Sequence, residues 1–238
     1  MLLQVDLGLI GYADAYALQK RIVAARKLSA IDDVLLLCEH PHVITQGRNG
    51  KREHLLAGEH VLRQKGVDFF ETSRGGDITY HGPGQIVGYP LILLSNIRRD
   101  IVWYVRMLEE AMIRATSEFG IEARRVEGRT GVWVDAPQSE EKLGAIGVHV
   151  SRWVTSHGFA YNVSTDLRYF DLIVPCGISD RRATSLEKLL NRAVRTFDVA
   201  PLLARHTAEV FGLERVSISV EELHNRLAHA EQPAALSA

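Results

Sequence analysis

One stretch of the chain decides how the rest of it is interpreted: Arg74-Gly75-Gly76-Asp77-Ile78-Thr79-Tyr80-His81-Gly82-Pro83-Gly84-Gln85. Five of these twelve residues are glycine or proline, a density that argues against a regular helix or strand. A hairpin turn would account for the glycines, but the segment also carries more polar side chains than a turn needs. We therefore expect a binding loop. It has neither the Gly-Lys-Ser/Thr of a P-loop nor the Gly-x-Gly-x-x-Gly of a dinucleotide loop.

The composition around this loop is that of an ordinary globular protein. Among 238 residues there are 28 Lys and Arg against 29 Asp and Glu, which gives a formal net charge of −1. This balance argues against an electrostatic nucleic-acid binder and against a polybasic membrane anchor. No apolar run approaches the roughly 18 residues of a membrane span. The start of the chain carries Asp6 where a signal peptide needs a basic and then a long apolar stretch, so we expect no signal peptide there. Two cysteines cannot form a disulfide framework, so we expect a cytoplasmic protein.

Helical and strand-like periods alternate along the chain. Ala15, Leu18, Ile22 and Ala25 form one apolar stripe at helical spacing. Residues 34–38 form a short apolar run that indicates a buried strand. The clearest helical stripe begins at Ile101, after Asp100 as the candidate N-cap, and ends before Gly120. Strands are then expected at residues 121–126, 130–134, 143–150 and 159–163. The sequence predicts an α/β (α+β) fold with a mixed sheet flanked by helices.

The last part of the chain is expected to be a short helical C-terminal segment. Ser219-Val-Glu-Glu222 has the capping-box pattern, and Pro201 suits a first helical turn. A composition shift separates this segment, so we divide the chain into a catalytic domain at residues 1–195 and a helical appendage at residues 196–238.

The two cysteines stand in different contexts. Cys38 ends an apolar run and is expected to be a buried core residue. The spacing of Cys38, His40 and His42 allows a metal site, but a second pair of ligands is missing, so we predict none. Cys176 lies between Pro175 and Gly177, shortly before three charged residues, in a position that suits either a nucleophile or a structural loop cysteine.

Lys142 and His157 are further candidates for chemistry. Lys142 opens the strand-like segment 142–148, where a solvated lysine is the ordinary interpretation. Near a thiol, its ammonium would stabilise the thiolate and its neutral amine would accept a proton. The 34 residues between Lys142 and Cys176 do not show whether the two meet. His157 suits either an acid/base role or a structural hydrogen bond.

Several motifs occur in a fixed order along the first four fifths of the chain. They are Glu39-His40-Pro41 with Gly47-Arg48, Arg74 through Gln85, Gly128-Arg129-Thr130-Gly131-Val132-Trp133, Lys142 through Gly147, His157-Gly158 with Asn162, and Pro175-Cys176-Gly177-Ile178 with Thr184-Ser185. In this combination the chain resembles the octanoyltransferases of lipoate biosynthesis, the lipoyl(octanoyl) transferase family, over most of residues 8–195.

The resemblance implies a fold, a reaction and a set of partners. The fold would be the catalytic domain shared with biotin and lipoate ligases. The donor would be octanoyl-acyl carrier protein, in which the acyl group is a thioester of phosphopantetheine. The acceptor would be a lysine of a lipoyl domain of a 2-oxoacid dehydrogenase, or of the glycine-cleavage H protein. No cofactor, nucleic acid or membrane is implied.

The resemblance also implies the residues of the site. Cys176 would carry the octanoyl group as a thioester, and Lys142 would lower the pKa of its thiol and relay protons. The acyl group would lie among residues from three segments. These residues are Arg74, Gly75, Gly76, Asp77, Ile78, Thr79, Tyr80, His81, Ala145, Ile146, Gly147, Gly158, Phe159 and Ala160.

Two alternatives remain open at this point. An ATP-dependent lipoate or biotin ligase of the same fold would form an adenylate and would need no cysteine. A non-catalytic module that binds an acyl carrier would keep the apolar slot without using Cys176.

Overall fold

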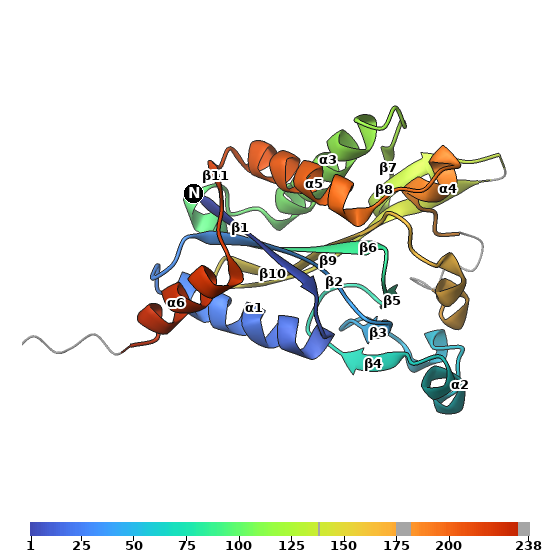
Figure 1. Ribbon diagram of the computed structural model, residues 1–238, viewed down its shortest axis with the longest axis horizontal. Coiled ribbons are helices and arrows are strands. Elements are labelled where there is room, and N and C mark those ends of the chain that lie inside the picture. Colours follow the sequence, from blue (N-terminus) through green and yellow to red (C-terminus); the bar gives the residue numbers. More distant parts are fainter. Residues whose placement is uncertain (138, 175–181, 233–238) are drawn as a thin grey trace, which may run out of the picture.

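A large mixed sheet lies between two layers of helices (Figure 1). The computed structural model describes residues 1–137, 139–174 and 182–232. Within these residues eight strands form the large sheet. In spatial order they are β11 (Arg215–Ser217), β1 (Leu2–Leu9), β2 (Asp33–Glu39), β6 (Gln85–Leu91), β10 (Val154–Asn162), β9 (Glu140–Ser151), β8 (Arg129–Asp135) and β7 (Arg124–Val126). Strand β1 pairs in parallel with both of its neighbours, and the remaining pairs are antiparallel.

Each face of the sheet is covered by two helices. Helices α3 (Ile101–Ser117) and α5 (Thr196–Phe211) cover one face, and α1 (Tyr12–Lys27) and α6 (Val220–Ala230) cover the other (Figure 1). Two hydrophobic clusters fill the spaces between the layers. The mixed α/β architecture predicted from the sequence is therefore confirmed.

The apolar stripes of the sequence become the buried faces of these helices. In α1 the stripe Ala15, Leu18, Ile22 and Ala25 is buried against the sheet. Helix α3 begins after Asp100, whose carboxylate accepts a hydrogen bond of 2.9 Å from the Trp103 amide. This bond satisfies one of the amides that have no partner within the first turn of a helix.

A second, smaller sheet lies beside the end of the large one. It consists of β4 (Asp68–Glu71), β3 (Val43–Gln46) and β5 (Ile78–His81), next to α2 (Glu59–Gln64). The expectation that residues 74–85 contain no regular strand is thus wrong for Ile78–His81. Only residues 72–77 form the glycine-rich loop, and β5 then pairs with β3 in antiparallel register.

Other boundaries also differ from the expectation. The strand expected at residues 159–163 begins five residues earlier, at Val154. The strand expected at residues 121–126 is confined to Arg124–Val126. Helix α5 begins at Thr196, so Pro201 lies inside the helix rather than in its first turn. Proline has no amide hydrogen, and the carbonyl four residues earlier belongs to Phe197, a residue on the exposed side of α5.

The residues after 195 pack closely against the rest of the chain. Helix α5 lies on α3, where the ring of Phe211 is 5.5 Å from that of Tyr104. Strand β11 extends the large sheet beside β1, and Leu223 and Leu227 of α6 lie in the cluster beneath α1. None of the helices in the described residues has the length and apolar character needed to cross a bilayer.

The packing of α5 predicts a large loss of stability for one substitution. Leu203 is fully buried between α5 and the sheet, whereas Phe197 in the same helix is 76% exposed. Leu203→Ala should lower the free energy of unfolding by about 2–5 kcal/mol, because it leaves a cavity in the core. Phe197→Ala serves as the control and should change it by less than about 0.5 kcal/mol. Urea unfolding followed by circular dichroism measures both. Equal stabilities for the two variants would show that α5 is not part of the cooperative core.

Candidate active site

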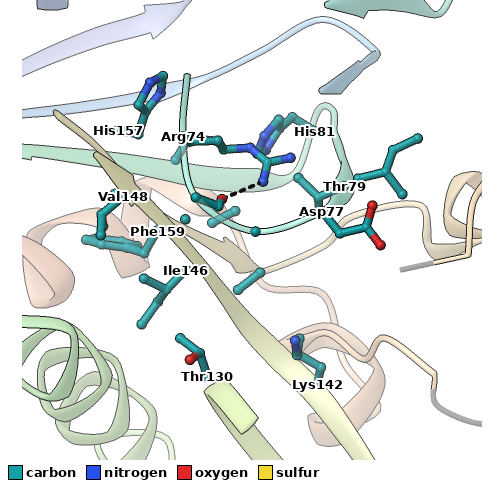
Figure 2. Close-up of a pocket in the computed structure, with 18 of the residues that line it drawn as sticks. Arg74, Asp77, Thr79, His81, Thr130, Lys142, Ile146, Val148, His157 and Phe159 are labelled. Carbon is teal, nitrogen blue, oxygen red and sulfur yellow. Dashed lines mark hydrogen bonds between the residues drawn. The ribbon is translucent and has the colours of Figure 1, made fainter. Parts of the chain in front are cut away.

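A cavity of about 460 Å³ opens between the glycine-rich loop and strands β9 and β10. Its size is typical of small-molecule sites. In Figure 2 the loop with Asp77 lies on one side of the cavity, and Lys142 and Thr130 lie on the other. Ile146, Val148 and Phe159 form an apolar group beside it. The cavity therefore joins an apolar region to a polar rim.

The glycine-rich loop lies directly on strand β9. The Gly75 amide donates to the Val148 carbonyl at 2.8 Å, and the Gly47 amide donates to the Asp77 carbonyl at 2.9 Å. A Cβ atom on Gly147 would lie 3.0 Å from the Gly75 oxygen, and one on Gly47 only 2.4 Å from the Gly76 oxygen. The loop reaches this position because these residues have no side chain.

The buried side chain of Arg74 holds the loop in place through hydrogen bonds. The residue is 7% exposed. Its guanidinium donates to the Thr45 carbonyl at 2.6 Å and to the Thr45 hydroxyl at 3.0 Å. It also donates to the Gly75 carbonyl at 3.1 Å (Figure 2). A buried arginine needs such partners because its charge is otherwise costly to desolvate. These bonds give Arg74 a structural role beside the cavity.

A chain of side-chain hydrogen bonds runs from His81, at the end of β5, towards Lys142. His81 Nδ1 is 2.7 Å from Gln85 Oε1, and Gln85 Nε2 donates to Asn162 Oδ1 at 2.9 Å. The Asn162 amide group then donates to the Thr184 carbonyl at 2.9 Å. Because the Gln85 oxygen is the acceptor, Nδ1 carries the proton of His81. This chain fixes the positions of β5, β6, β10 and the segment that begins at Arg182.

Two buried histidines beside the cavity are neutral. The pKa of His81 is lowered to about 3, mainly by burial and to a smaller extent by His40 and Arg74. The pKa of His157 is likewise lowered to about 3, mainly by burial and to a smaller extent by the charge of Arg74. Desolvation disfavours the charged imidazolium. Neither histidine is therefore a proton donor near neutral pH.

Lys142 lies on β9 at the rim of the cavity. Its ammonium nitrogen is 4.6 Å from the centre of the Trp133 ring. Its main-chain amide donates to the Arg182 carbonyl at 3.0 Å, and its carbonyl accepts from the Thr184 amide at 2.9 Å. The strand that carries Lys142 thus also holds the chain at Arg182 and Thr184.

Val174, the last described residue before Cys176, is held by a residue near the glycine-rich loop. The Val174 amide donates to the His54 carbonyl at 2.8 Å. The His54 ring in turn is 2.5 Å from the carboxylate of Asp77, which lines the cavity. Cys176, the expected nucleophile, lies outside the described residues. Of the described residues on either side of it, Arg182 lines the cavity and bonds to Lys142, whereas Val174 bonds to His54 outside the cavity lining.

The structure brings nearly all of the other expected site residues together around this one cavity. Tyr80 is the exception, because it is buried among Tyr169 and Phe170 and does not line the cavity. The expected residues that do line it are Arg74, Gly75, Gly76, Asp77, Ile78, Thr79, His81, Lys142, Ala145, Ile146, Gly147, Gly158, Phe159 and Ala160.

Sequence reasoning missed several lining residues. Tyr12 comes from the start of α1, Val87 and Tyr89 from β6, and Val105 from α3. Each belongs to an apolar pattern that is equally typical of a core, so no local signal marks it. The conspicuous motif Gly128 to Trp133 was the one available clue, since Gly128, Arg129, Thr130 and Trp133 also line the cavity.

Cys38 is a core residue, as predicted. It is 4% exposed, and burial raises the pKa of its thiol. His40 bonds the Ile10 carbonyl and the Tyr89 hydroxyl, each at 2.7 Å, whereas His42 bonds the Tyr80 hydroxyl. In residues 1–137, 139–174 and 182–232, no three His, Cys, Asp or Glu side chains are grouped as a metal ion requires.

The chain is similar to known proteins over most of its length. Residues 11–208 match the family model described as the lipoyl protein ligase A/B catalytic domain. An octanoyltransferase of Solibacter usitatus is 53% identical over 209 residues, which are 88% of this chain and 92% of that protein. An octanoyltransferase of Acidobacterium capsulatum is 51% identical over 219 residues, covering 87% and 89% of the two chains.

Solved structures share the fold at low sequence identity. The bipartite lipoate protein ligase of Thermoplasma acidophilum superposes with a TM-score of 0.72 at 18% identity, covering 95% of this chain and 89% of that one. A biotin protein ligase of Aquifex aeolicus gives 0.52 at 13% identity, covering 89% and 70%. These likenesses show the lipoate and biotin ligase fold. With the family match and the close relatives, they show that the chain belongs to the lipoyl protein ligase A/B catalytic-domain family, as an enzyme of its octanoyltransferase group.

Proposed function

We propose that the enzyme transfers an octanoyl group from octanoyl-acyl carrier protein to a lysine of lipoyl domains and of the glycine-cleavage H protein, through a thioester on Cys176. The observation that carries the proposal is the place of Lys142. It lines the cavity, and its backbone holds the chain at Arg182, six residues after Cys176. The relatives' name, octanoyltransferase, supports the acyl group and the reaction class.

In the first half-reaction, the Cys176 thiolate attacks the carbonyl carbon of the donor thioester. The bond to the carrier's pantetheine sulfur breaks, and that sulfur leaves as a thiolate, which takes a proton from the Lys142 ammonium. A thiolate is the reactive form of cysteine, and a nearby ammonium favours it. Exchange of one thioester for another is close to thermoneutral, so positioning rather than ATP supplies the rate.

In the second half-reaction, the amine of the acceptor lysine attacks the Cys176 thioester. The bond to the cysteine sulfur breaks, an amide forms, and the proton of the attacking amine passes to Lys142, now neutral. The ammonium and thiolate of the resting enzyme are thereby restored. A single lysine that gives and then takes one proton satisfies both half-reactions.

The acyl chain is proposed to lie along the small residues of β9 and β10. Ala145 pairs with Ala160 across the strands, and Gly147 pairs with Gly158. All four line the cavity, beneath the glycine-rich loop. Short side chains leave room for a flexible chain while keeping its surroundings apolar. The Gly75 amide is already bonded to Val148, so a different donor has to stabilise the carbonyl oxygen of the thioester.

The proposed partners and setting follow from the same chemistry. Carrier and lipoyl domains meet the enzyme at the cavity rim, and local charge steers such encounters even where net charge is near zero. Arg48, Lys51 and Arg52 form an exposed basic group close to the loop. We place the reaction in the cytoplasm, where a thiol nucleophile stays reduced.

The two alternatives differ from this proposal in what they require. An ATP-dependent ligase would need ATP and would tolerate loss of Cys176. A non-catalytic carrier-binding module would bind the octanoyl carrier without turnover. Transfer from octanoyl-carrier protein in the absence of ATP is expected only of the transferase. Acyl transfer that requires ATP is expected only of the ligase, and the module would give neither.

The thioester intermediate predicts a covalent adduct. Mixing the enzyme with octanoyl-carrier protein, without acceptor, should add the mass of one octanoyl group to the chain. Intact-mass spectrometry measures the adduct, and peptide mapping should place it on Cys176. Cys176→Ala is the matched control and should stay unmodified. Turnover of octanoyl transfer by an enzyme that never shows the adduct would exclude the intermediate.

Substitutions at the two reactive positions should lower the rate by very different amounts. Cys176→Ala should abolish transfer, whereas Lys142→Ala should slow it about 100-fold, the range of one general acid–base group. Cys38→Ala, at the buried cysteine, should keep the wild-type rate per folded molecule. Steady-state transfer to a lipoyl domain measures all three. A Cys176→Ala variant with wild-type activity would contradict the covalent mechanism.

The small residues beneath the loop predict control of acyl chain length. Ala145→Leu fills part of the cavity and should reduce transfer of octanoyl more than transfer of butyryl, by about 10-fold in their ratio, because several buried methylenes lose their site. The ratio is measured on one enzyme sample, so it does not depend on the folded fraction. Ala193→Leu, at an exposed position, is the control. An unchanged ratio would place the acyl chain elsewhere.

A further inference from the structure

Lys142 and Trp133 face each other across the β8–β9 pair. They are register partners on antiparallel strands, and the ammonium nitrogen lies 4.6 Å from the centre of the indole ring. Trp133 is 2% exposed and lines the cavity with Lys142. A cation this close to the face of a tryptophan is attracted by the ring's electron density, and the attraction is stronger where water is excluded.

The stem of Lys142 passes over a position that has no side chain. Gly131 lies two residues before Trp133, and a Cβ atom there would be 3.4 Å from Lys142 Cε and 2.6 Å from the Gly144 oxygen. The backbone of Gly131 has a φ of +124°, which strongly favours glycine. The pairing of β8 with β9 shifts its register between Val132 and Trp133. This irregularity brings glycine and tryptophan together beneath the lysine.

A buried carboxylate holds the irregular strand in place. The Gly131 amide donates to Glu109 Oε1 at 2.9 Å, and Glu109 is fully buried in α3. Its other oxygen accepts from Arg106 at 2.7 Å and from Arg125 at 3.1 Å. Charged acceptors form stronger hydrogen bonds than neutral ones. Glu109 therefore links helix α3 to the strand that supports Lys142.

We propose that Trp133 is a positioning residue for Lys142, holding its ammonium over the indole face at the rim of the cavity, where the proposed reaction needs a proton carrier. This inference rests on the proposed role of Lys142 and goes beyond it, because it assigns a function to a residue that is not proposed to touch the acyl group. A lysine has four flexible side-chain bonds, so each contact at its ammonium reduces the number of orientations that it samples. The Trp133 ring is one such contact.

The consequence is a specific kinetic effect. Losing the ring should lower kcat, because fewer molecules hold the ammonium in position, while KM for the acyl donor stays the same. A cation–π contact at a desolvated site corresponds to a factor of about 10. An aromatic replacement should retain part of the effect, since phenylalanine attracts a cation less strongly than tryptophan does.

The experiment is a double-mutant cycle between positions 133 and 142. In the wild-type background, Trp133→Leu should lower kcat for transfer about 10-fold, and Trp133→Phe about 3-fold. In the Lys142→Ala background, neither change should lower the rate further, because the group that Trp133 positions is gone. Trp103→Leu is the matched control. Trp103 also lies beneath a cation, Arg98 at 5.7 Å, but it does not line the cavity, so this change should leave kcat unaltered.

The outcomes of this cycle either support or contradict the positioning role of Trp133. A loss of the same size in both backgrounds, or a rise in KM at constant kcat, would overturn the positioning role. Circular dichroism and urea unfolding report whether each variant folds, and Trp133→Phe, which keeps an aromatic core residue, completes the cycle if Trp133→Leu does not fold. A Lys142→Ala variant as fast as wild type would instead refute the proposed role of Lys142, and so would be told apart from a failure at Trp133.

Discussion

The close contact between the glycine-rich loop and strand β9 is the constraint on which the site depends. The Gly75 amide bonds the Val148 carbonyl, and Gly147 has no side chain to hold the loop away from β9. Gly47 likewise allows the loop to approach the segment after β3. Arg74 fixes the same loop to Thr45 from below. The cavity is the space left beside this contact, so its shape is set by backbone geometry more than by the choice of lining side chains.

Sequence reasoning anticipated the parts of the fold that follow from local periodicity. The stripes of α1 and α3 and the apolar run of β2 have the buried faces that their spacing indicates. It missed β5, because the glycines around Ile78–His81 suggested an irregular loop. Within a strand, side chains alternate between faces, which is why Tyr80 points into the aromatic cluster while its neighbours Thr79 and His81 line the cavity. Tyr12 and Tyr89 join the site only through tertiary packing, which no local pattern encodes.

The shared fold does not determine which reaction an enzyme of this family catalyses. Lipoate and biotin ligases share this architecture at identities below 20%, so the architecture alone does not distinguish an adenylate-forming ligase from a transferase. In the mechanism that we propose, the distinction lies in a few positions at the cavity rim. Among them Lys142 combines two roles. Its side chain lines the cavity, and its backbone forms hydrogen bonds with Arg182 and Thr184.

Because of that second role, the backbone and the side chain of residue 142 serve different purposes. The bonds to Arg182 and Thr184 use only the main-chain amide and carbonyl of Lys142, which every residue except proline provides. The path of the chain is therefore insensitive to what the side chain at this position is. The side chain at residue 142 can therefore be exchanged without changing the hydrogen bonds that hold Arg182 and Thr184.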